Sequence, residues 1–342
     1  MTSLHEAAIV DAILKGEWEK VLSEATEWSE RSESSPRAFF AINIASLIQG
    51  NFAKAWHVHG QALEEPEDIE SVKEWVEALQ RTSPENSNVQ LVTGLFLGQS
   101  AKSEESVACY EKAIELDPTS PYPHFFQAQI FQRMERKDLA IKSYREAVKR
   151  DSSYIAARLN LGVAYQDQGQ LEMAIPQYRE ILKLHPDDAV AHTNLGCALA
   201  EQGKIEPAII EYKRALELVP EDPEVHFALG GIYETKGRKD LAQRAYEEAL
   251  RLAPDFFPAA TAIGWYSLEK GRVDTALDYF SKALQVNPND ASATFGVGRV
   301  YDAKGKEEIA GDHYCRALDL EKNADRKSRI LNFIDRIGGG RG

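Results

Sequence analysis

The sequence predicts an all-α protein built as a solenoid of stacked helical hairpins. Two observations predict this class. Glycine recurs at intervals of 34 residues along much of the 342-residue chain, and a fixed period of this length is typical of a repeat array. Within each 34-residue unit, apolar residues follow the i, i+3, i+4, i+7 spacing of an amphipathic helix, once before and once after a second glycine.

The repeat is defined by residue types that return in register. A glycine lies inside the first expected helix of five consecutive units, at Gly162, Gly196, Gly230, Gly264 and Gly298. An alanine and an aromatic residue follow at constant distances, as Ala174 and Tyr178 follow Gly162. Extending this register in both directions gives seven units over 87–324, namely 87–120, 121–154, 155–188, 189–222, 223–256, 257–290 and 291–324.

The glycine inside the first helix needs a structural reason, because glycine there costs about 0.8–1 kcal/mol relative to alanine. We predict that the two helices of a unit cross at Gly162 and Ala174, where a larger side chain would force them apart, and that Tyr178 covers the remaining gap. The second glycine of each unit, such as Gly203, is expected to end the first helix in a left-handed conformation.

One unit carries the full set of residues of a known repeat pattern: Leu161, Gly162, Tyr165, Ala174, Tyr178 and Pro186. This pattern resembles the tetratricopeptide repeat, a helix–turn–helix unit of the same length. The resemblance implies a right-handed superhelix in which the first helices of successive repeats line an inner groove. Pro176 departs from the pattern, since it falls inside a second helix and is expected to kink it.

The two ends of the chain deviate from the repeat register. Residues 1–86 read as an N-terminal helical region of degenerate repeats: one helix pair over 7–25 hinged near Gly16, a second over 38–63 hinged at Gly50, and a single helix over 68–80. This region either continues the solenoid or forms a separate module for dimerisation or a second partner. After the repeats, we expect a capping helix over 325–337 and a disordered tail over 338–342.

Charge and composition exclude several classes of partner. The net charge is −14, and residues 1–86 alone hold 7 basic against 16 acidic residues, so nucleic acid and anionic membranes are not expected partners. No apolar run is long enough for a membrane span, and the first residues lack the features of a secretory signal. The three cysteines are odd in number and distant in sequence, which favours reduced thiols and a cytoplasmic location.

The sequence contains none of the motifs that would indicate an enzyme. A phosphate loop, a zinc-binding His-Glu-x-x-His or Cys-x-x-Cys pattern and a Gly-x-Ser-x-Gly elbow are all missing. His57 and His59 are two residues apart, so they would point to different sides of a helix rather than grip one metal ion. We therefore expect no catalytic residues, no cofactor and no metal.

Instead, the first helices carry apolar and polar residues on the side opposite their packed stripe. The candidate partner-binding residues of this concave groove are Phe125, Phe126, Asn160, Asn194, Phe227, Trp265, Phe295 and Arg299. An alternative interpretation is that some of them pack against the neighbouring repeat. Asn160 and Asn194 match only part of the basic clamp with which some members of this family bind chaperone C-termini, so we do not expect that specificity.

These observations predict a non-enzymatic scaffold that binds a peptide or helix of another protein in the groove. The alternative is a self-assembling structural scaffold or assembly factor, a homo-oligomer that uses its ends or its N-terminal block. Light scattering across a range of concentrations separates the two, because a strictly monomeric chain excludes self-assembly.

Overall fold

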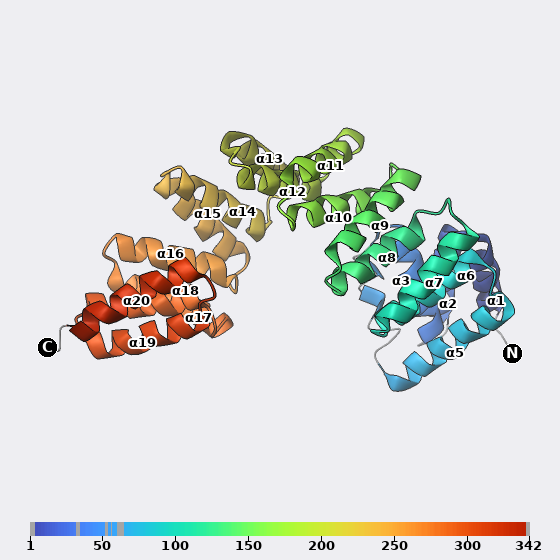
Figure 1. Ribbon diagram of the computed structural model, residues 1–342, viewed down its shortest axis with the longest axis horizontal. Coiled ribbons are helices and arrows are strands. Elements are labelled where there is room, and N and C mark those ends of the chain that lie inside the picture. The colour runs from blue at the N-terminus through green and yellow to red at the C-terminus, as the bar shows by residue number, and fades with distance from the viewer. Residues whose placement is uncertain (1–3, 32–34, 52–53, 56, 60–64, 340–342) are drawn as a thin grey trace. The chain divides into compact units, whose positions relative to one another are not determined.

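The computed structural model describes residues 4–31, 35–51, 54–55, 57–59 and 65–339, and within these ranges the regular elements are all helices (Figure 1). The protein is therefore of the all-α class, as predicted. It divides into two compact units, Met1–Pro186 and Asp187–Gly342. The end of the N-terminal region expected at residue 86 lies inside the first unit. None of the described helices is both long and apolar enough to cross a lipid bilayer.

The first unit begins with helices that precede the regular repeats: α1 (Leu4–Lys15), α2 (Trp18–Arg31), α3 (Pro36–Ile48) and α5 (Pro66–Thr82). Gly16 joins α1 to α2 with φ +72°, at the predicted hinge. The helix expected to pair with α3 falls partly on residues outside the described ranges. The single helix α5, expected over 68–80, packs against α3 and against the first helix of the repeat array.

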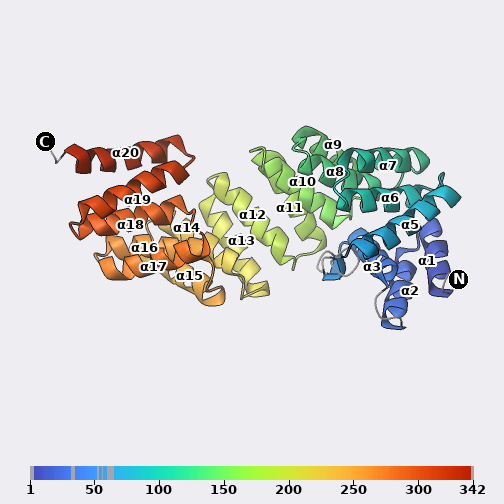
Figure 2. The ribbon, with the colours of Figure 1, turned by 90° about the horizontal axis from the view of Figure 1, so that it is seen from below.

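The remaining helices form hairpins. In the first unit these are α6 (Ser87–Gln99) with α7 (Ser103–Leu116), α8 (Tyr122–Arg133) with α9 (Lys137–Arg150), and α10 (Ile155–Gln166) with α11 (Leu171–Leu184). The second unit contains α12 (Ala189–Glu201) with α13 (Ile205–Leu218), α14 (Pro223–Thr235) with α15 (Lys239–Leu252), α16 (Phe257–Glu269) with α17 (Val273–Val286), and α18 (Ala291–Ala303) with α19 (Glu307–Leu320). The α18–α19 pair can be followed in both ribbon views (Figure 2). Helix α11 is continuous through Pro176.

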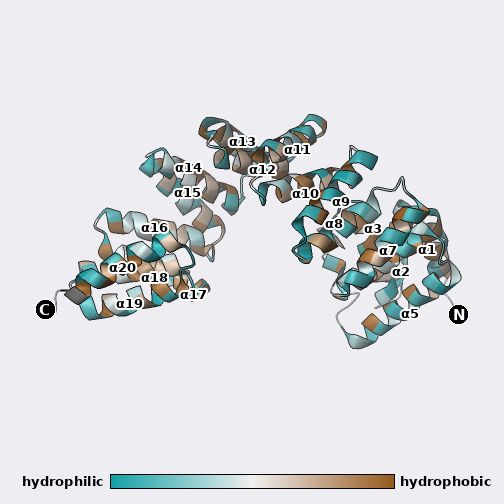
Figure 3. Ribbon diagram, viewed as in Figure 1, coloured by the Kyte–Doolittle hydropathy of each residue, from teal (hydrophilic) through white to brown (hydrophobic). Residues whose placement is uncertain are grey.

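Where the first helix of a hairpin carries the repeat glycine, this glycine faces the aromatic ring of the second helix. In 223–256, a Cβ atom built on Gly230 would lie 2.4 Å from Cε1 of Tyr246, well inside van der Waals contact. The ring, rather than the backbone of the second helix, therefore occupies the space that glycine leaves open. The side chains around it are apolar, and hydrophobic and hydrophilic residues alternate along each ribbon as expected for amphipathic helices (Figure 3).

The turns within the hairpins use a left-handed residue. Gly237, for example, has φ +69°. In the first two repeats the same position is held by Ala101 with φ +58° and by Glu135 with φ +57°. Residues with a Cβ atom adopt this conformation at a cost, so these two turns are less stable than their glycine counterparts.

Polar contacts tie the turn of one repeat to the second helix of the repeat before it. Lys304 Nζ lies 2.6 Å from Asp274 Oδ1, and Gln168 Nε2 donates to Asp138 Oδ1 at 3.1 Å. These pairs occupy equivalent positions in their repeats, so the contact recurs along the array. It helps to set the spacing between successive hairpins within each unit.

The second unit ends with α20 (Ala324–Gly339), which packs against α19. Ile330 is 3% exposed, and Phe333 and Ile337 pack on the cluster that surrounds Tyr314. The helix extends two residues past the expected end of the capping helix. The rest of the expected tail, 340–342, lies outside the described residues.

Candidate functional site

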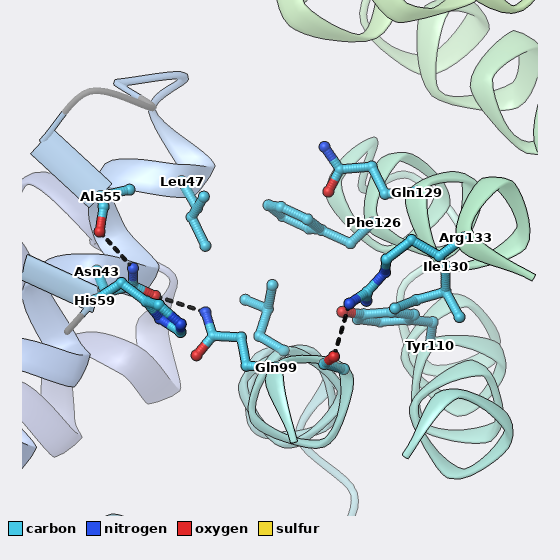
Figure 4. A pocket seen from close by; sticks show the side chains of 12 residues that line it. Asn43, Leu47, Ala55, His59, Gln99, Tyr110, Phe126, Gln129, Ile130 and Arg133 are labelled. Atoms are coloured by element: carbon cyan, nitrogen blue, oxygen red, sulfur yellow. Dashed lines mark hydrogen bonds between the residues drawn. The ribbon is translucent and has the colours of Figure 1, made fainter. Parts of the chain in front are cut away.

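A cavity of about 330 Å³ opens in the first unit where three first helices meet, and Figure 4 shows the side chains around it. One wall comes from α3 and the residues that follow it, the floor from α6, and the other wall from α8. Helix α3 is outside the regular register, so this junction differs from the junctions between regular repeats. The cavity therefore depends on both the N-terminal helices and the repeat array.

The inner surface of this pocket is mainly apolar. Leu47 and Phe126 extend from opposite walls into the space beside α6, and Leu95 and Ile130 complete the apolar surface (Figure 4). Phe126 is only 2% exposed and stacks on Tyr110 with ring centroids 6.4 Å apart, so its position is fixed. Leu47 is half-buried, which makes it the more accessible of the two.

A chain of amide groups forms one polar edge of the pocket. Asn43 Nδ2 donates to the Ala55 carbonyl oxygen at 2.8 Å, and Gln99 Nε2 donates to Asn43 Oδ1 at 2.7 Å. A carbonyl can only accept, so this order fixes the orientation of both amides. It leaves Gln99 Oε1 as a buried acceptor that no described group satisfies.

Arg133 forms the opposite polar edge. Its Nη1 donates to the Gly98 carbonyl oxygen at 2.9 Å, near the C-terminal end of α6, where carbonyl groups lack partners within the helix (Figure 4). Nearby arginines are paired: Arg136 contacts Glu104 and Arg150 contacts Glu146. Among the described residues, Arg133 has no such carboxylate partner.

A smaller cavity of about 240 Å³ occupies the equivalent place in the second unit, between α14, α15 and α16. Trp265 and Glu269 stand there at the positions of Gln129 and Arg133. Lys239 forms an ion pair with Glu269. The same position in the repeat therefore carries opposite charges in the two units.

Phe125 and Phe227, which were also expected in the groove, contact other side chains of the chain. Phe125 is fully buried, and the ring of Phe227 lies 5.4 Å from those of both Tyr246 and Phe256. Asn160 and Asn194 are half-buried.

Three expected residues of the second unit come together near α20. Trp265 Nε1 donates to Ser292 Oγ at 3.0 Å, and its ring lies 5.7 Å from that of Phe295. The ring centroids of Phe295 and Phe333 are 5.3 Å apart, and Cζ of Arg299 lies 4.5 Å from the centroid of the Phe333 ring. These contacts leave Phe126 as the one expected residue that lines the larger pocket.

The described residues contain no group of three or more histidine, cysteine, aspartate or glutamate side chains that could hold a metal ion. Cys109, Cys197 and Cys315 are free thiols, and burial raises the pKa of Cys109 and of Cys197. Such thiols are mainly protonated at neutral pH and are poor nucleophiles.

Family models described as the tetratricopeptide repeat match residues 93–120, 125–189, 196–237, 223–256 and 261–325, which together make up more than half of the chain. The chain belongs to the tetratricopeptide-repeat family. Proteins with this repeat are generally protein-interaction scaffolds, and the repeats of this tetratricopeptide-repeat protein support such a role. No curated protein sequence matches it significantly.

Solved structures of other repeat proteins share the fold. A chain of the APC/C hetero-tetramer Cut9–Hcn1 is 20% identical with a TM-score of 0.57, over 83% of this chain and 52% of that one. Yeast Tom70 is 14% identical with a TM-score of 0.53, over 98% and 88% of the two chains. YrrB, a repeat protein with an unusual peptide-binding site, is 20% identical with a TM-score of 0.49, over 55% and 96%. At these identities the likeness concerns the fold alone.

Proposed function

We propose that this protein is a non-enzymatic adaptor that holds an extended segment of a partner protein against the first helices of its repeats. In this proposal, the pocket between α3, α6 and α8 is the main anchoring site. The observation that carries it is the convergence of Leu47, Leu95 and Phe126 from three separate helices on one open cavity. Fixed polar groups stand at both edges of that cavity.

The composition of the pocket supports a binding role. Binding sites are mostly apolar surfaces with a few placed polar groups, and their volumes run from about 300 to 1,000 Å³. At about 330 Å³ this pocket is at the small end, which suits one or two side chains of a peptide. The surrounding first helices would then contact the rest of the segment.

The residues expected from the sequence take different roles in this proposal. Phe126 contributes directly to the pocket of the first unit, and Trp265 lines the smaller cavity of the second unit. Asn160 and Asn194 are half-buried and remain candidates for hydrogen bonds to a bound backbone. The other four expected residues, Phe125, Phe227, Phe295 and Arg299, would support this surface through their contacts inside the chain.

The test is a selection from a random displayed dodecapeptide library on the immobilised full chain. Leu47→Glu places a charge in the pocket at a half-exposed position, and Leu184→Glu makes the same change at a position 52% exposed on α11. We expect the natural sequence and Leu184→Glu to select the same peptides, and Leu47→Glu to lose them.

Circular dichroism and light scattering on the same samples show whether the fold and the oligomeric state are preserved. If a folded Leu47→Glu variant retains the selected peptides at full strength, the pocket is not the anchoring site. If the natural sequence selects no peptide at all, the adaptor proposal fails as a whole.

A further inference from the structure

We infer that the pocket between α3, α6 and α8 selects segments in which a large apolar side chain stands close to an acidic one. The apolar side chain enters between Leu47 and Phe126, and the carboxylate pairs with Arg133. This inference rests on the proposed function and adds the chemical class of the partner segment.

The guanidinium of Arg133 is held at the edge of the pocket by its contact with α6. Its Nη1 donates to the Gly98 carbonyl oxygen at 2.9 Å. Gly98 makes this approach possible, because a Cβ atom there would lie 3.3 Å from Arg133 Nη2 and 2.9 Å from Cδ1 of Ile130. The arginine is thus positioned before any ligand arrives, which reduces the entropy lost on binding.

The positive charge of Arg133 has no acidic counterpart among the described residues of the pocket. No aspartate or glutamate is among the described residues that line it, although the whole chain holds 54 acidic residues. One nitrogen of the guanidinium is used by Gly98, and the remaining N–H groups can donate to a carboxylate. An unpaired cation beside an apolar surface favours a ligand that offers both a carboxylate and an apolar group.

Gln99 fixes the opposite edge of the pocket. Its Nε2 atom donates to Asn43 Oδ1 at 2.7 Å, and its Oε1 atom is buried. The two amides therefore shape this edge, and the charge preference of the pocket comes from Arg133.

The charge preference is specific to this pocket. Across the seven repeats, the position of Arg133 is occupied by Gln99, Arg133, Asp167, Glu201, Thr235, Glu269 and Ala303, so Arg133 is the one basic residue in the series. The cavity of the second unit is lined by Glu234, Lys239 and Glu269, and Lys239 is paired with Glu269. Of these two cavities, the first is therefore the one that offers a carboxylate an arginine with no described acidic partner.

The test uses the displayed dodecapeptide library, whose peptides have no free C-terminus, with Arg133→Glu and the control Arg145→Glu on the exposed face of α9. We expect the natural sequence and the control to enrich Asp or Glu within a few residues of Leu, Ile, Met or Phe. Arg133→Glu is expected to enrich Lys or Arg in that place. A change of preference cannot arise from a loss of folding.

A selected peptide is then synthesised with both ends blocked, as the acidic form and with Gln in place of Glu. We expect the acidic form to bind the natural sequence about fivefold more tightly in low salt, and both forms to bind Arg133→Met equally. Peptides that require Leu47 but show no acidic preference overturn this inference and leave the adaptor proposal standing. Tighter binding through a free C-terminal carboxylate, with no effect of the internal Glu, also overturns it.

Discussion

The ring of Tyr178 fills the space that a side chain at Gly162 would need, since a Cβ atom on Gly162 would lie 2.5 Å from Cε1 of the ring. Tyr178 is fully buried, and its hydroxyl donates to Gln166 Oε1 at 3.1 Å, so the ring has little freedom to move aside. The helix propensity lost at glycine is offset by the burial of this ring. The same relationship recurs between Gly230 and Tyr246.

Gly230→Ala should therefore destabilise the protein even though alanine is the better helix former. The added methyl group meets a buried ring at 2.4 Å, and overpacking of this kind costs about 1–3 kcal/mol. Gly230→Leu should be more damaging. Urea denaturation followed by circular dichroism measures the free energy of unfolding.

The adjacent residue provides a matched control. A Cβ atom on Gly231 would have only the Tyr246 hydroxyl within reach, at 3.9 Å. Gly231→Ala should thus stabilise the protein by up to about 1 kcal/mol through helix propensity. Equal stabilisation by both substitutions would show that the ring does not restrict Gly230.

Glycine should stabilise the two turns that lack it. Ala101 and Glu135 adopt φ +58° and +57°, where a Cβ atom costs about 1–2 kcal/mol. Part of this gain is offset by the larger backbone entropy of glycine in the unfolded chain. We expect Ala101→Gly and Glu135→Gly each to raise the free energy of unfolding by about 0.5–1 kcal/mol in urea titrations.

The reverse change tests the same principle. Gly237 has φ +69° with no heavy atom within 4 Å of an added Cβ, so Gly237→Ala carries only the backbone cost. A loss of about 1 kcal/mol is expected. Were Glu135→Gly destabilising and Gly237→Ala neutral, turn conformation would not limit stability here.

The hairpins were predictable because their determinants are local. The glycine of a first helix and its aromatic partner in the second lie in the same 34-residue unit, as Gly264 and Phe280 do, so their spacing is visible in the sequence. The repeat pattern is weaker in the two repeats with Ala101 and Glu135 in their turns. There the left-handed position is held by alanine or glutamate, and neither residue type indicates a left-handed conformation in a sequence.

The pocket was less predictable because it combines distant residues. Phe126 was expected on the groove side, but Leu47, Gln99 and Arg133 were not, since α3 is out of register and only packing brings it near α8. Neighbouring positions were also difficult to distinguish. Phe125 is fully buried whereas Phe126 lines the pocket, and two adjacent phenylalanines give no sequence signal for this difference.

Acidification should weaken the fold through His124. This side chain is 7% exposed, and its Nε2 has no described hydrogen-bond partner. Burial, with a smaller effect from Arg150, lowers its pKa from 6.5 to about 4. Between these two pH values, His124 binds a proton in the unfolded chain but not in the folded chain. Its contribution to the free energy of unfolding is therefore fully present above pH 6.5 and is lost as the pH falls toward 4.

The expected size of this loss is about 1–2 kcal/mol between pH 7.5 and pH 5. His124→Leu removes the titrating group, while His185→Gln changes an exposed histidine as a control. As the pH falls, the natural sequence and His185→Gln should lose unfolding free energy in parallel. His124→Leu should lose less, because it lacks the titrating group. Parallel curves for all three would contradict the assignment to His124.

The N-terminal helices should depend on the ion pair between Glu6 and Arg37. Glu6 is 6% exposed, and Arg37 Nη1 donates to its Oε1 at 2.9 Å, while Arg37 Nε also donates to the Ser71 carbonyl oxygen at 3.2 Å. The arginine thus connects α1, α3 and α5. Removing one partner of a buried pair costs about 3–5 kcal/mol, and because the Arg37 side chain is 29% exposed we expect the lower end of this range for Arg37→Met.

Two comparisons separate the buried charge from general loss of packing. The double variant Glu6→Gln/Arg37→Met should recover part of the stability, because no carboxylate is then left in the interior without its cation. Arg31→Met removes an exposed arginine that contacts His5 Nε2 at 3.2 Å and pairs with Glu27 at 3.5 Å, and should change stability by less than about 1 kcal/mol. If the double variant is less stable than Arg37→Met alone, Arg37 acts through packing and its bond to Ser71 rather than through the charge of Glu6.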